Sequence, residues 1–192
     1  MDTTKKVYIG VSARHIHLSQ EHIELLFGKG YTLKVLKQLS QPNQFAAEEV
    51  ISVIGPKSRI DNIRILGPSR GRSQLEISRT DSFALGIQPP VRDSGDLEGT
   101  PGIRVVGPVG EIELQEGVIV ASRHIHIHPE EARKWGISNK QWLTVRLDGG
   151  RPLILEQVLA RVSEQFTLEL HIDTDEANAA GVKTGDWAVL VE

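Results

Sequence analysis

The stretch VIVASRHIHIHPEEA, residues 118–132, sets the architecture we expect, because a close copy of it occurs earlier in the chain. The copy is GVSARHIHLSQEHI, residues 10–23, and the two Arg-His-Ile-His motifs lie 109 residues apart. A second pair of similar segments closes each half, LEISRTDSFALGI at 75–87 and LELHIDTDEANAAGV at 168–182. The chain is therefore predicted to consist of two related halves with the same order of strands and short helices.

Between these repeated segments, the chain reads mostly as short β-strands. The intervening runs are rich in β-branched residues, alternate partly between apolar and polar positions, and are interrupted by turn residues. The interruptions are Gly-Pro and Asp-Gly-Gly sequences at 55–56, 67–68, 107–108 and 148–150. Many short strands at this spacing favour a mainly β fold, either a barrel or a sandwich.

Helices are expected to be few and brief. Ser19 is predicted to cap one helix, and Asp173 or Thr174 is predicted to cap another that ends at Gly181. The stretch QPPVRDSGDLEGTPG, residues 88–102, is rich in proline, glycine and acidic residues, and we expect it to form a surface loop.

Composition excludes several classes of protein. The 192 residues include 39% hydrophobic and 24% charged residues, which is ordinary for a globular protein with a buried core. The absence of cysteine excludes disulfides, thiolate metal sites and a cysteine nucleophile. A net charge of -3 without a basic stripe argues against nucleic acid and anionic membranes as partners. No apolar run approaches the ~20 residues of a membrane span, and the first ten residues lack a signal-peptide core, so we expect a cytoplasmic protein.

Each Arg-His-Ile-His motif places two histidines at alternate positions, His15 with His17 and His124 with His126. In a strand, such residues point to the same face with Cα atoms ~6.5–7 Å apart, while the isoleucine between them points the other way. Two neutral imidazoles at that separation can bind one divalent ion. A single such motif is more often a surface or packed pair, but its repetition favours a metal site. Zinc is the leading candidate, and cobalt, nickel and iron accept the same ligand types.

Further candidate ligands lie in the two closing segments. His171 stands in the Leu-Glu strand of the second half, where the first half carries Glu76. We therefore expect Glu76 and His171 to play corresponding parts, and the alternative for Glu76 is a solvated strand carboxylate. Glu169 is a spare candidate, His128 is expected to cap a helix or lie exposed, and His22 is expected on a helix surface.

The turn LGPSRGRSQ, residues 66–74, has the composition of an anion-binding loop. Glycine allows close approach of the backbone, and an arginine fork matches phosphate or carboxylate geometry. Arg70 is placed to reach an anion held at a metal bound by Glu76, and the alternative is a solvated basic turn. The sequence contains no Walker loop, dinucleotide fingerprint or Gly-x-Ser-x-Gly nucleophile motif.

Taken in order, VSARHIHLS, GPSRG, LEISRTD, VIVASRHIHIHPEEA and LELHIDTDEANAAG resemble the phosphate propanoyltransferases, the phosphotransacylases of the propanediol-utilisation (PduL) type. The resemblance runs from about Val7 to Glu192. It implies a phosphate acyltransferase that interconverts a short acyl-CoA (acetyl or propanoyl) and phosphate with acyl phosphate and free coenzyme A. These compounds are therefore the expected partners.

The same resemblance implies a mainly β fold of two β-barrel domains capped by short helices, with a site of two zinc ions between them. The domains would be residues 14–121 and residues 1–13 plus 122–192, with the first strand crossing over. Arg70 matches the family's phosphate-contacting arginine and is the expected catalytic and phosphate-binding residue. The implied metal ligands are His15, His17, Glu76, His124, His126 and His171.

One departure from the family pattern bears on location. Members housed in bacterial microcompartments carry an amphipathic N-terminal extension, whereas about six residues precede the first predicted strand here, so the chain resembles a cytosolic member. A homodimer is the expected oligomer.

Two other functions could use the same ligands, namely those of a binuclear metal-dependent hydrolase and of a non-catalytic metal-binding barrel. Acetyl and propanoyl groups differ by one methylene, worth only ~1–3 kcal/mol in a pocket, so the sequence does not select between them.

Overall fold

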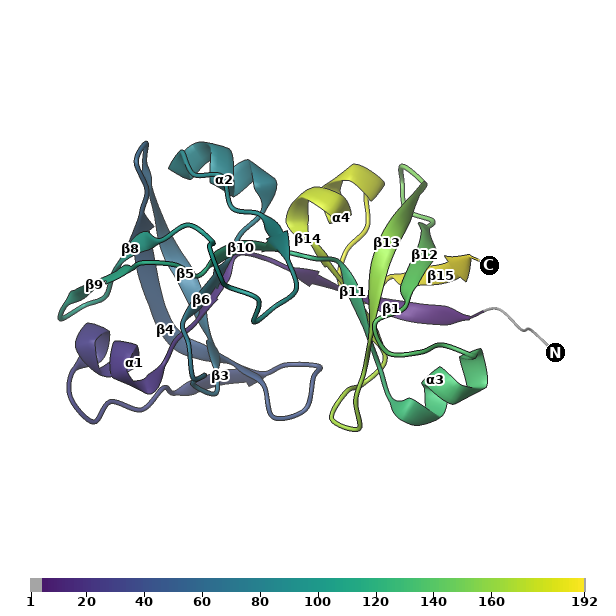
Figure 1. Cartoon of the computed structure of the whole chain (residues 1–192), viewed down its shortest axis with the longest axis horizontal. Helices are drawn as coiled ribbons and strands as arrows, with labels where there is room; N and C mark the ends of the chain where they lie inside the picture. Colours follow the sequence, from purple (N-terminus) through teal and green to yellow (C-terminus); the bar gives the residue numbers. More distant parts are fainter. Residues whose placement is uncertain (1–4, 192) are drawn as a thin grey trace. The chain divides into compact units, whose positions relative to one another are not determined.

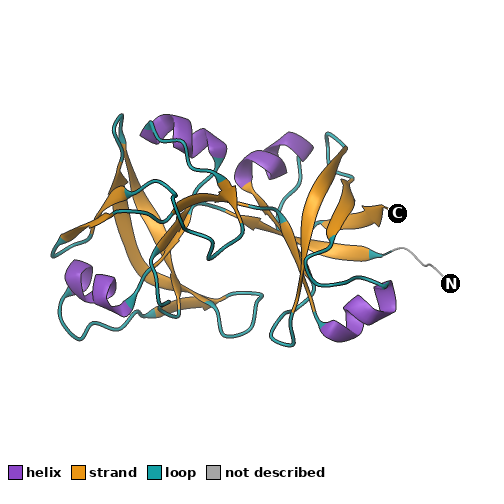
Figure 2. Cartoon of the chain, in the orientation of Figure 1, coloured by secondary structure: helices purple, strands orange, loops and turns teal. Residues whose placement is uncertain are grey.

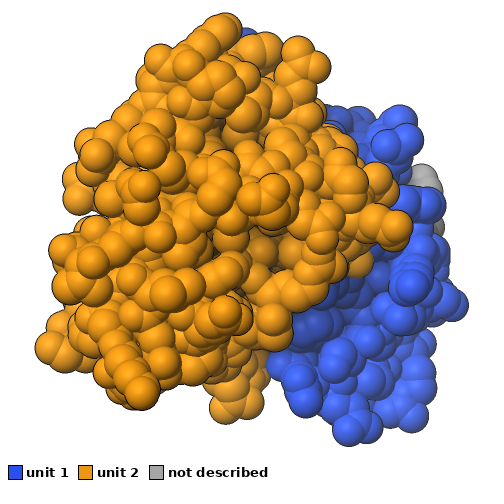
Figure 3. All heavy atoms as spheres, turned by 60° about the vertical axis from the view of Figure 1, so that its left-hand side comes forward, with its two compact units in different colours: residues 1–13, 122–192 blue, residues 14–121 orange. Residues whose placement is uncertain are grey.

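The computed structural model describes residues 5–191, which form mainly β-strands with four short helices among them (Figures 1 and 2). The predicted fold class is thereby confirmed. The chain divides into two compact units (Figure 3): unit 1 contains the described residues up to Ala13 and from Ser122 onward, and unit 2 contains residues 14–121. Each unit has its own hydrophobic core. None of the helices among the described residues has the length and apolar character needed to cross a membrane.

Unit 1 is a closed barrel with the strand order β1-β14-β11-β13-β12-β15. Its strands are β1 Lys6–Ser12, β11 His124–Ile127, β12 Trp142–Leu147, β13 Leu153–Val162, β14 Glu169–Asp173 and β15 Trp187–Val191. β1 pairs in parallel with β14 and antiparallel with β15, so the first strand of the chain closes a barrel made otherwise from its C-terminal part (Figure 1). Two helices belong to this unit, α3 Pro129–Trp135 and α4 Thr174–Ala180, and they follow β11 and β14 directly.

Alternation of side chains along the strands fills the interior of this barrel. In β1, Val7 and Ile9 are buried, whereas Tyr8 between them is exposed. All four residues of β11 are buried, but only its two isoleucines, Ile125 and Ile127, belong to the hydrophobic core. Burying each isoleucine contributes ~1.5–3 kcal/mol, which fixes the opposite, histidine-bearing face of β11 in one orientation.

Unit 2 is a nine-stranded sheet in the order β7-β10-β6-β2-β5-β4-β8-β9, with β3 paired to β4 (Figure 1). Its strands are β2 His15–His17, β3 Val35–Gln38, β4 Phe45–Ile54, β5 Arg59–Gly67, β6 Gln74–Glu76, β7 Val91–Arg92, β8 Ile103–Val106, β9 Glu111–Leu114 and β10 Val118–Ala121. Its helices are α1 Gln20–Phe27 and α2 Arg79–Leu85. Unit 1 is therefore a closed barrel, whereas unit 2 is a curled sheet that runs from β7 to β9.

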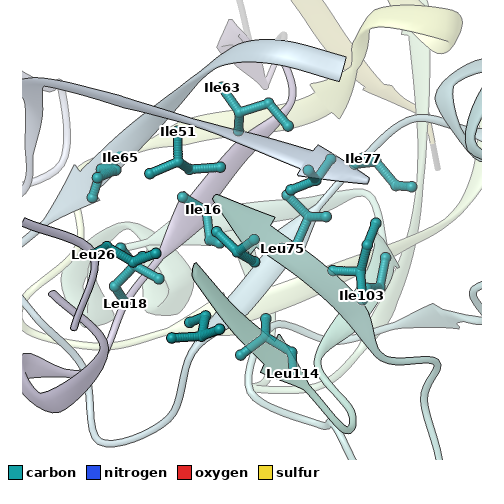
Figure 4. Close-up of a cluster of buried hydrophobic side chains, with 14 of the residues drawn as sticks. Ile16, Leu18, Leu26, Ile51, Ile63, Ile65, Leu75, Ile77, Ile103 and Leu114 are labelled. Atoms are coloured by element: carbon teal, nitrogen blue, oxygen red, sulfur yellow. The ribbon is translucent and has the colours of Figure 1, made fainter. Parts of the chain in front are cut away.

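The core of unit 2 holds β2 against β6 (Figure 4). Ile16, between the two histidines of β2, and Leu75, at the centre of β6, are register partners and are both fully buried. Ile16 is also the register partner of Ile65 in β5, which lies on the other side of β2. Because these apolar side chains occupy one face of the sheet, the polar residues of β2 and β6 point to the other face.

Helix boundaries follow the signals read from the sequence. Ser19 caps α1, and Asp173 caps α4 in a capping box, so both predicted caps are confirmed. Gly181 ends α4 in the left-handed region at φ 67°, which favours glycine. His128 is the N-cap of α3, where its Nδ1 accepts a hydrogen bond from the Glu130 N–H. Of the two roles predicted for His128, helix capping is therefore confirmed.

Two local predictions need correction. His22 does not lie freely on the surface of α1, because it is half-buried and its Nδ1 lies 2.6 Å from the Ser73 hydroxyl oxygen. The segment 88–102 is not simply a surface loop either. It contains β7, and its Leu97 and Thr100 are buried. Composition identified the turns of this segment but could not show the path that brings it against the sheet.

Candidate metal sites

Unit 2 brings together three of the predicted ligands, His15, His17 and Glu76. β2 and β6 are antiparallel, with His15 opposite Glu76 and His17 opposite Gln74. The Nε2 atoms of His15 and His17 lie 3.5 and 4.0 Å from the Glu76 carboxylate oxygens, and the two imidazole rings are 5.1 Å apart. All three side chains are nearly inaccessible to solvent, with 12% exposure at Glu76.

Unit 1 brings together the other three predicted ligands, His124, His126 and His171. β11 and β14 are antiparallel, with His124 opposite His171 and His126 opposite Glu169. The three ring centroids lie 4.7 to 5.0 Å from one another. The two units thus repeat one arrangement, in which the first histidine of the motif faces the third ligand across an antiparallel pair.

Both groups have the spacing and chemistry of a divalent metal site. In each group, one ligand atom from every residue lies within 4.8 Å of the others. Zinc bonds of ~2.0–2.2 Å to imidazole and carboxylate require donors at about this separation. Three protein ligands leave a fourth position of a tetrahedral ion for water or substrate, which is the pattern of a catalytic rather than a structural zinc.

In two histidines of unit 1, hydrogen bonds determine which ring nitrogen can offer its lone pair to a metal ion. The Nδ1 of His124 lies 2.8 Å from the Ser122 carbonyl oxygen, which only accepts, so Nδ1 carries the hydrogen and Nε2 offers its lone pair. The Nε2 of His171 lies 2.8 Å from the Glu169 carboxylate, so its Nδ1 offers the lone pair. Partners of this kind hold a metal-binding imidazole in the correct tautomer and orientation.

The second histidine of each site is neutral. Burial, followed by the neighbouring His15 and Arg70, lowers the pKa of His17 to about 3. Burial, followed by its two histidine neighbours, lowers the pKa of His126 to about 2. In the part of the chain that the structure describes, the Nδ1 atoms of these two rings are buried without a hydrogen-bond partner. Burial thus holds both rings in the neutral form that metal ligation requires.

An arginine and a hydroxyl lie beside the site of unit 2. Arg70 donates from Nη1 to the Ser94 hydroxyl over 3.2 Å, and Ser94 donates to the Glu76 carboxylate over 3.1 Å. Gln74 donates to the same two groups, over 2.8 Å to Ser94 and 2.5 Å to Glu76. The structure thus places Arg70 one hydroxyl away from the carboxylate of the candidate site.

Ser94 and Gln74 were not among the predicted site residues. Ser94 lies in the segment 88–102, whose composition predicted a loop and gave no sign of contact with the β6 strand. Gln74 closes the basic turn at 66–74, and nothing in its sequence context distinguishes it from a solvated residue. The repeat gave no signal either, because its matching Leu-Glu pairs align Glu169 with Glu76, and only the strand register places Gln74 and Glu169 at equivalent positions.

The motif arginines lie outside the two ligand groups. Arg14 forms an ion pair of 2.7 Å with Asp81, and Arg123 forms one of 2.8 Å with Glu176. Asp81 and Glu176 are the third residues of α2 and α4, where each completes a capping box. Each arginine therefore ties its histidine strand to the helix that follows the third ligand, which limits the movement of the two elements against each other.

An aromatic side chain covers one ligand of unit 1. Phe166 stacks on His126 with a ring separation of 4.0 Å and an interplanar angle of 18°. The guanidinium of Arg161 lies over the same phenyl ring at 5.6 Å. This stack keeps water from one face of the imidazole and restricts its rotation.

We predict that the metal-free chain loses stability as the pH falls below about 6.5. Unfolded histidines have a pKa of ~6.5, whereas His17 and His126 in the folded chain titrate near 3 and 2. The unfolded chain therefore binds more protons in this window, so acidification favours unfolding. Together the two groups lower the free energy of unfolding by up to about 2–3 kcal/mol between pH 7 and 5.5, which urea denaturation at both pH values measures.

The contribution of one ring can be isolated. His126→Asn is expected to remove about half of this loss between pH 7 and 5.5. His128→Asn is the matched control, since asparagine also caps a helix well and His128 lies outside both sites. The same pH dependence in wild type and His126→Asn would contradict the prediction.

The chain is similar over nearly its whole length to phosphate propanoyltransferases of several bacteria. The family model described as phosphate propanoyltransferase matches residues 8–183. The phosphate propanoyltransferase of Thermotoga maritima is 54% identical over 97% of this chain and 89% of its own length. Those of Priestia megaterium and Listeria monocytogenes are 50% and 49% identical, over 98% and 93% of this chain and 88% and 84% of their own lengths.

The matched residues include both Arg-His-Ile-His motifs and both closing segments. The chain is therefore an enzyme of the phosphate acyltransferase class, as the motifs predict. It belongs to the phosphate propanoyltransferase family.

Proposed function

We propose that the chain transfers an acyl group between coenzyme A and inorganic phosphate, using two zinc ions, one in each unit. The proposal rests on a group of three ligands, most of them buried, that is repeated in the two units of a chain of the phosphate propanoyltransferase family. His15, His17 and Glu76 would hold the ion of unit 2. The three histidines of the second group would hold the ion of unit 1, and both ions would keep an open position.

The chemistry requires positive charge at two places. Phosphate is an anionic nucleophile, and attack on a thioester carbonyl develops a second negative charge on oxygen. A bound zinc ion supplies Lewis-acid polarisation and neutralises such charge. Arg70 orients the phosphate, because its guanidinium is linked through Ser94 to Glu76 and can bind two phosphate oxygens at once. Positioning of this kind contributes ~7–11 kcal/mol in well-oriented reactions.

Direct attack of phosphate on the thioester is the route we favour. The chain has no cysteine, so a thioester between the acyl group and the protein cannot form. An acyl-glutamate intermediate is the second route. Glu76 is placed to hold a cation. Its carboxylate lies close to both histidines of the site and accepts hydrogen bonds from Gln74 and Ser94, which makes it a poor nucleophile. Direct transfer therefore fits the contacts of the site better.

The domain limits and the oligomer are part of the proposal. We propose that the two compact units, residues 14–121 and residues 1–13 with 122–192, are the two domains implied by the family resemblance. We also propose a homodimer, which light scattering of the purified chain tests directly.

One assay tests the proposed reaction against the two other functions. Release of free thiol from acetyl-CoA and propanoyl-CoA is followed with and without inorganic phosphate. We expect release to depend on phosphate and acyl phosphate to form in equal amount. Equal release without phosphate would indicate the hydrolase, and no release under either condition would indicate a non-catalytic metal-binding protein.

We predict that His126→Ala lowers the zinc content from two ions per chain to one. The change removes one of three ligands in unit 1 and leaves the group of unit 2 intact. Activity should fall at least 100-fold, measured beside the metal content by mass spectrometry of the desalted protein. Unchanged zinc content with the wild-type rate would refute the assignment of this ligand.

We predict that Arg70→Ala raises the KM for phosphate by roughly 10- to 100-fold. The loss corresponds to a charge-assisted hydrogen bond of ~1.5–3 kcal/mol. Arg72→Ala is the matched control, because Arg72 lies in the same turn but pairs with the exposed Glu116. The KM for acyl-CoA should change less than the KM for phosphate in Arg70→Ala. An unchanged phosphate dependence in this variant would refute the role of Arg70.

A further inference from the structure

We propose that Gln74 and Glu169 are positioning residues, each matched in chemistry to the metal ligand that it holds. Gln74 would hold the carboxylate ligand Glu76, and Glu169 would hold the imidazole ligand His171. The match gives each site one carboxylate charge, from the ligand itself in unit 2 and from its supporting residue in unit 1. This inference rests on the proposed metal sites and concerns residues outside the two ligand groups.

The two residues occupy equivalent places in the two units. Each lies two positions before the third ligand on the same strand, so its side chain points to the same face of the sheet as that ligand. Gln74 is the register partner of His17, and Glu169 is the register partner of His126. Both are buried, with 1% and 8% exposure, so neither is a solvated surface residue.

Each residue makes a short hydrogen bond to the ligand that it would support. Gln74 donates from Nε2 to the Glu76 carboxylate over 2.5 Å. Its amide oxygen accepts from the Gly95 N–H over 2.7 Å, which fixes the orientation of the amide. Glu169 accepts from the Nε2 of His171 over 2.8 Å. The direction of the hydrogen bond is therefore reversed between the two units.

The reversal follows from the chemistry of the ligands. A carboxylate ligand only accepts hydrogen bonds, so an amide N–H can hold it and a second carboxylate would repel it. An imidazole ligand carries a hydrogen on the nitrogen that faces away from the metal, so a carboxylate can accept it and strengthen the ligand. Glutamine beside Glu76 and glutamate beside His171 are thus each the residue type that suits the neighbouring ligand.

The charges of the two sites become equal through this exchange. In unit 2 the ligands are two neutral histidines and one carboxylate, whereas in unit 1 they are three histidines. Glu169 adds the missing negative charge beside His171. Each site also has one arginine nearby, since Arg70 reaches Glu76 through Ser94 in unit 2 and Arg161 lies over Phe166, which stacks on His126, in unit 1. Two sites of equal charge are expected to bind the same divalent ion with similar affinity.

The barrel wall of unit 1 leaves space for Glu169. Gly10 of β1 is the register partner of His171, and a Cβ atom at Gly10 would lie 2.7 Å from the Glu169 carboxylate oxygen. Gly10 lies in a regular strand and not in the left-handed region, so its backbone does not require glycine. A side chain at this position would therefore displace the Glu169 carboxylate from its place beside His171.

The test measures metal affinity of the full chain by competition between Co²⁺ or Zn²⁺ and a chelator. Wild type should bind two equivalents. Glu169→Gln should weaken one of them by roughly 10- to 100-fold and leave the other unchanged. The unchanged equivalent reports that unit 2 is folded, and an unchanged urea unfolding curve of the metal-free variant reports the same of unit 1, which has its own core. Glu164→Gln, an exposed carboxylate of the same unit, is the matched control and should leave both equivalents unchanged.

Exchange of the pair gives a result that a purely structural role would not produce. His171→Glu alone places two carboxylates side by side and should abolish binding in unit 1. The double variant Glu169→Gln, His171→Glu reproduces the Gln-Glu pair of unit 2 and should restore the second equivalent to within about tenfold of wild type. The absorption spectrum of bound Co²⁺ in the double variant should then resemble two copies of the unit 2 site.

Two outcomes would overturn the inference, and they differ from a failure of the proposed function. If Glu169→Gln binds both equivalents as tightly as wild type, Glu169 does not support the site. If the double variant binds no better than His171→Glu, the match between ligand and support is wrong. If wild type itself binds no metal, the proposed metal sites fail and the inference falls with them.

Discussion

Both candidate sites depend on one pairing, the antiparallel register between the Arg-His-Ile-His strand and the strand that carries the third ligand. In this register His15 faces Glu76, and His124 faces His171. A slip of one residue would turn the isoleucine of the motif toward the ligands and both histidines toward the core. The core opposes such a slip, because the buried isoleucine of each motif packs among apolar side chains on the other face.

The duplicated halves keep the geometry of the site while their chemistry differs. One half uses a carboxylate as third ligand and an amide beside it, and the other uses an imidazole and a carboxylate. The surrounding strands differ more, since unit 1 closes into a barrel and unit 2 remains a curled sheet. The two halves therefore share the part nearest to the ligands. This part includes the ion pair from each motif arginine to the helix that follows the third ligand.

Much of this organisation could be predicted from the sequence because it is encoded locally. The repeat, the strand composition, the caps at Ser19 and Asp173 and the alternation of the histidines all depend on residues close together in the chain. The contacts of Ser94 could not be predicted, because they depend on the path of the segment 88–102 past the sheet. The contact of Glu169 with His171 could not be predicted either, because it depends on the strand register and on the space left at Gly10, which is far from Glu169 in the sequence. The sequence also did not show that only the sheet of unit 1 closes into a barrel, because closure depends on pairing between strands that are distant in the chain.

The proposed catalysis requires that each group of three side chains bind one metal ion. Anomalous diffraction at the zinc edge, from crystals of the zinc-loaded full chain, tests it most directly. We expect two peaks per chain, one within ~2.0–2.2 Å of the donor atoms of His15, His17 and Glu76 and one equally close to those of the three histidines of unit 1. Peaks at other residues, or no peak at either group in crystals grown with excess zinc, would contradict it.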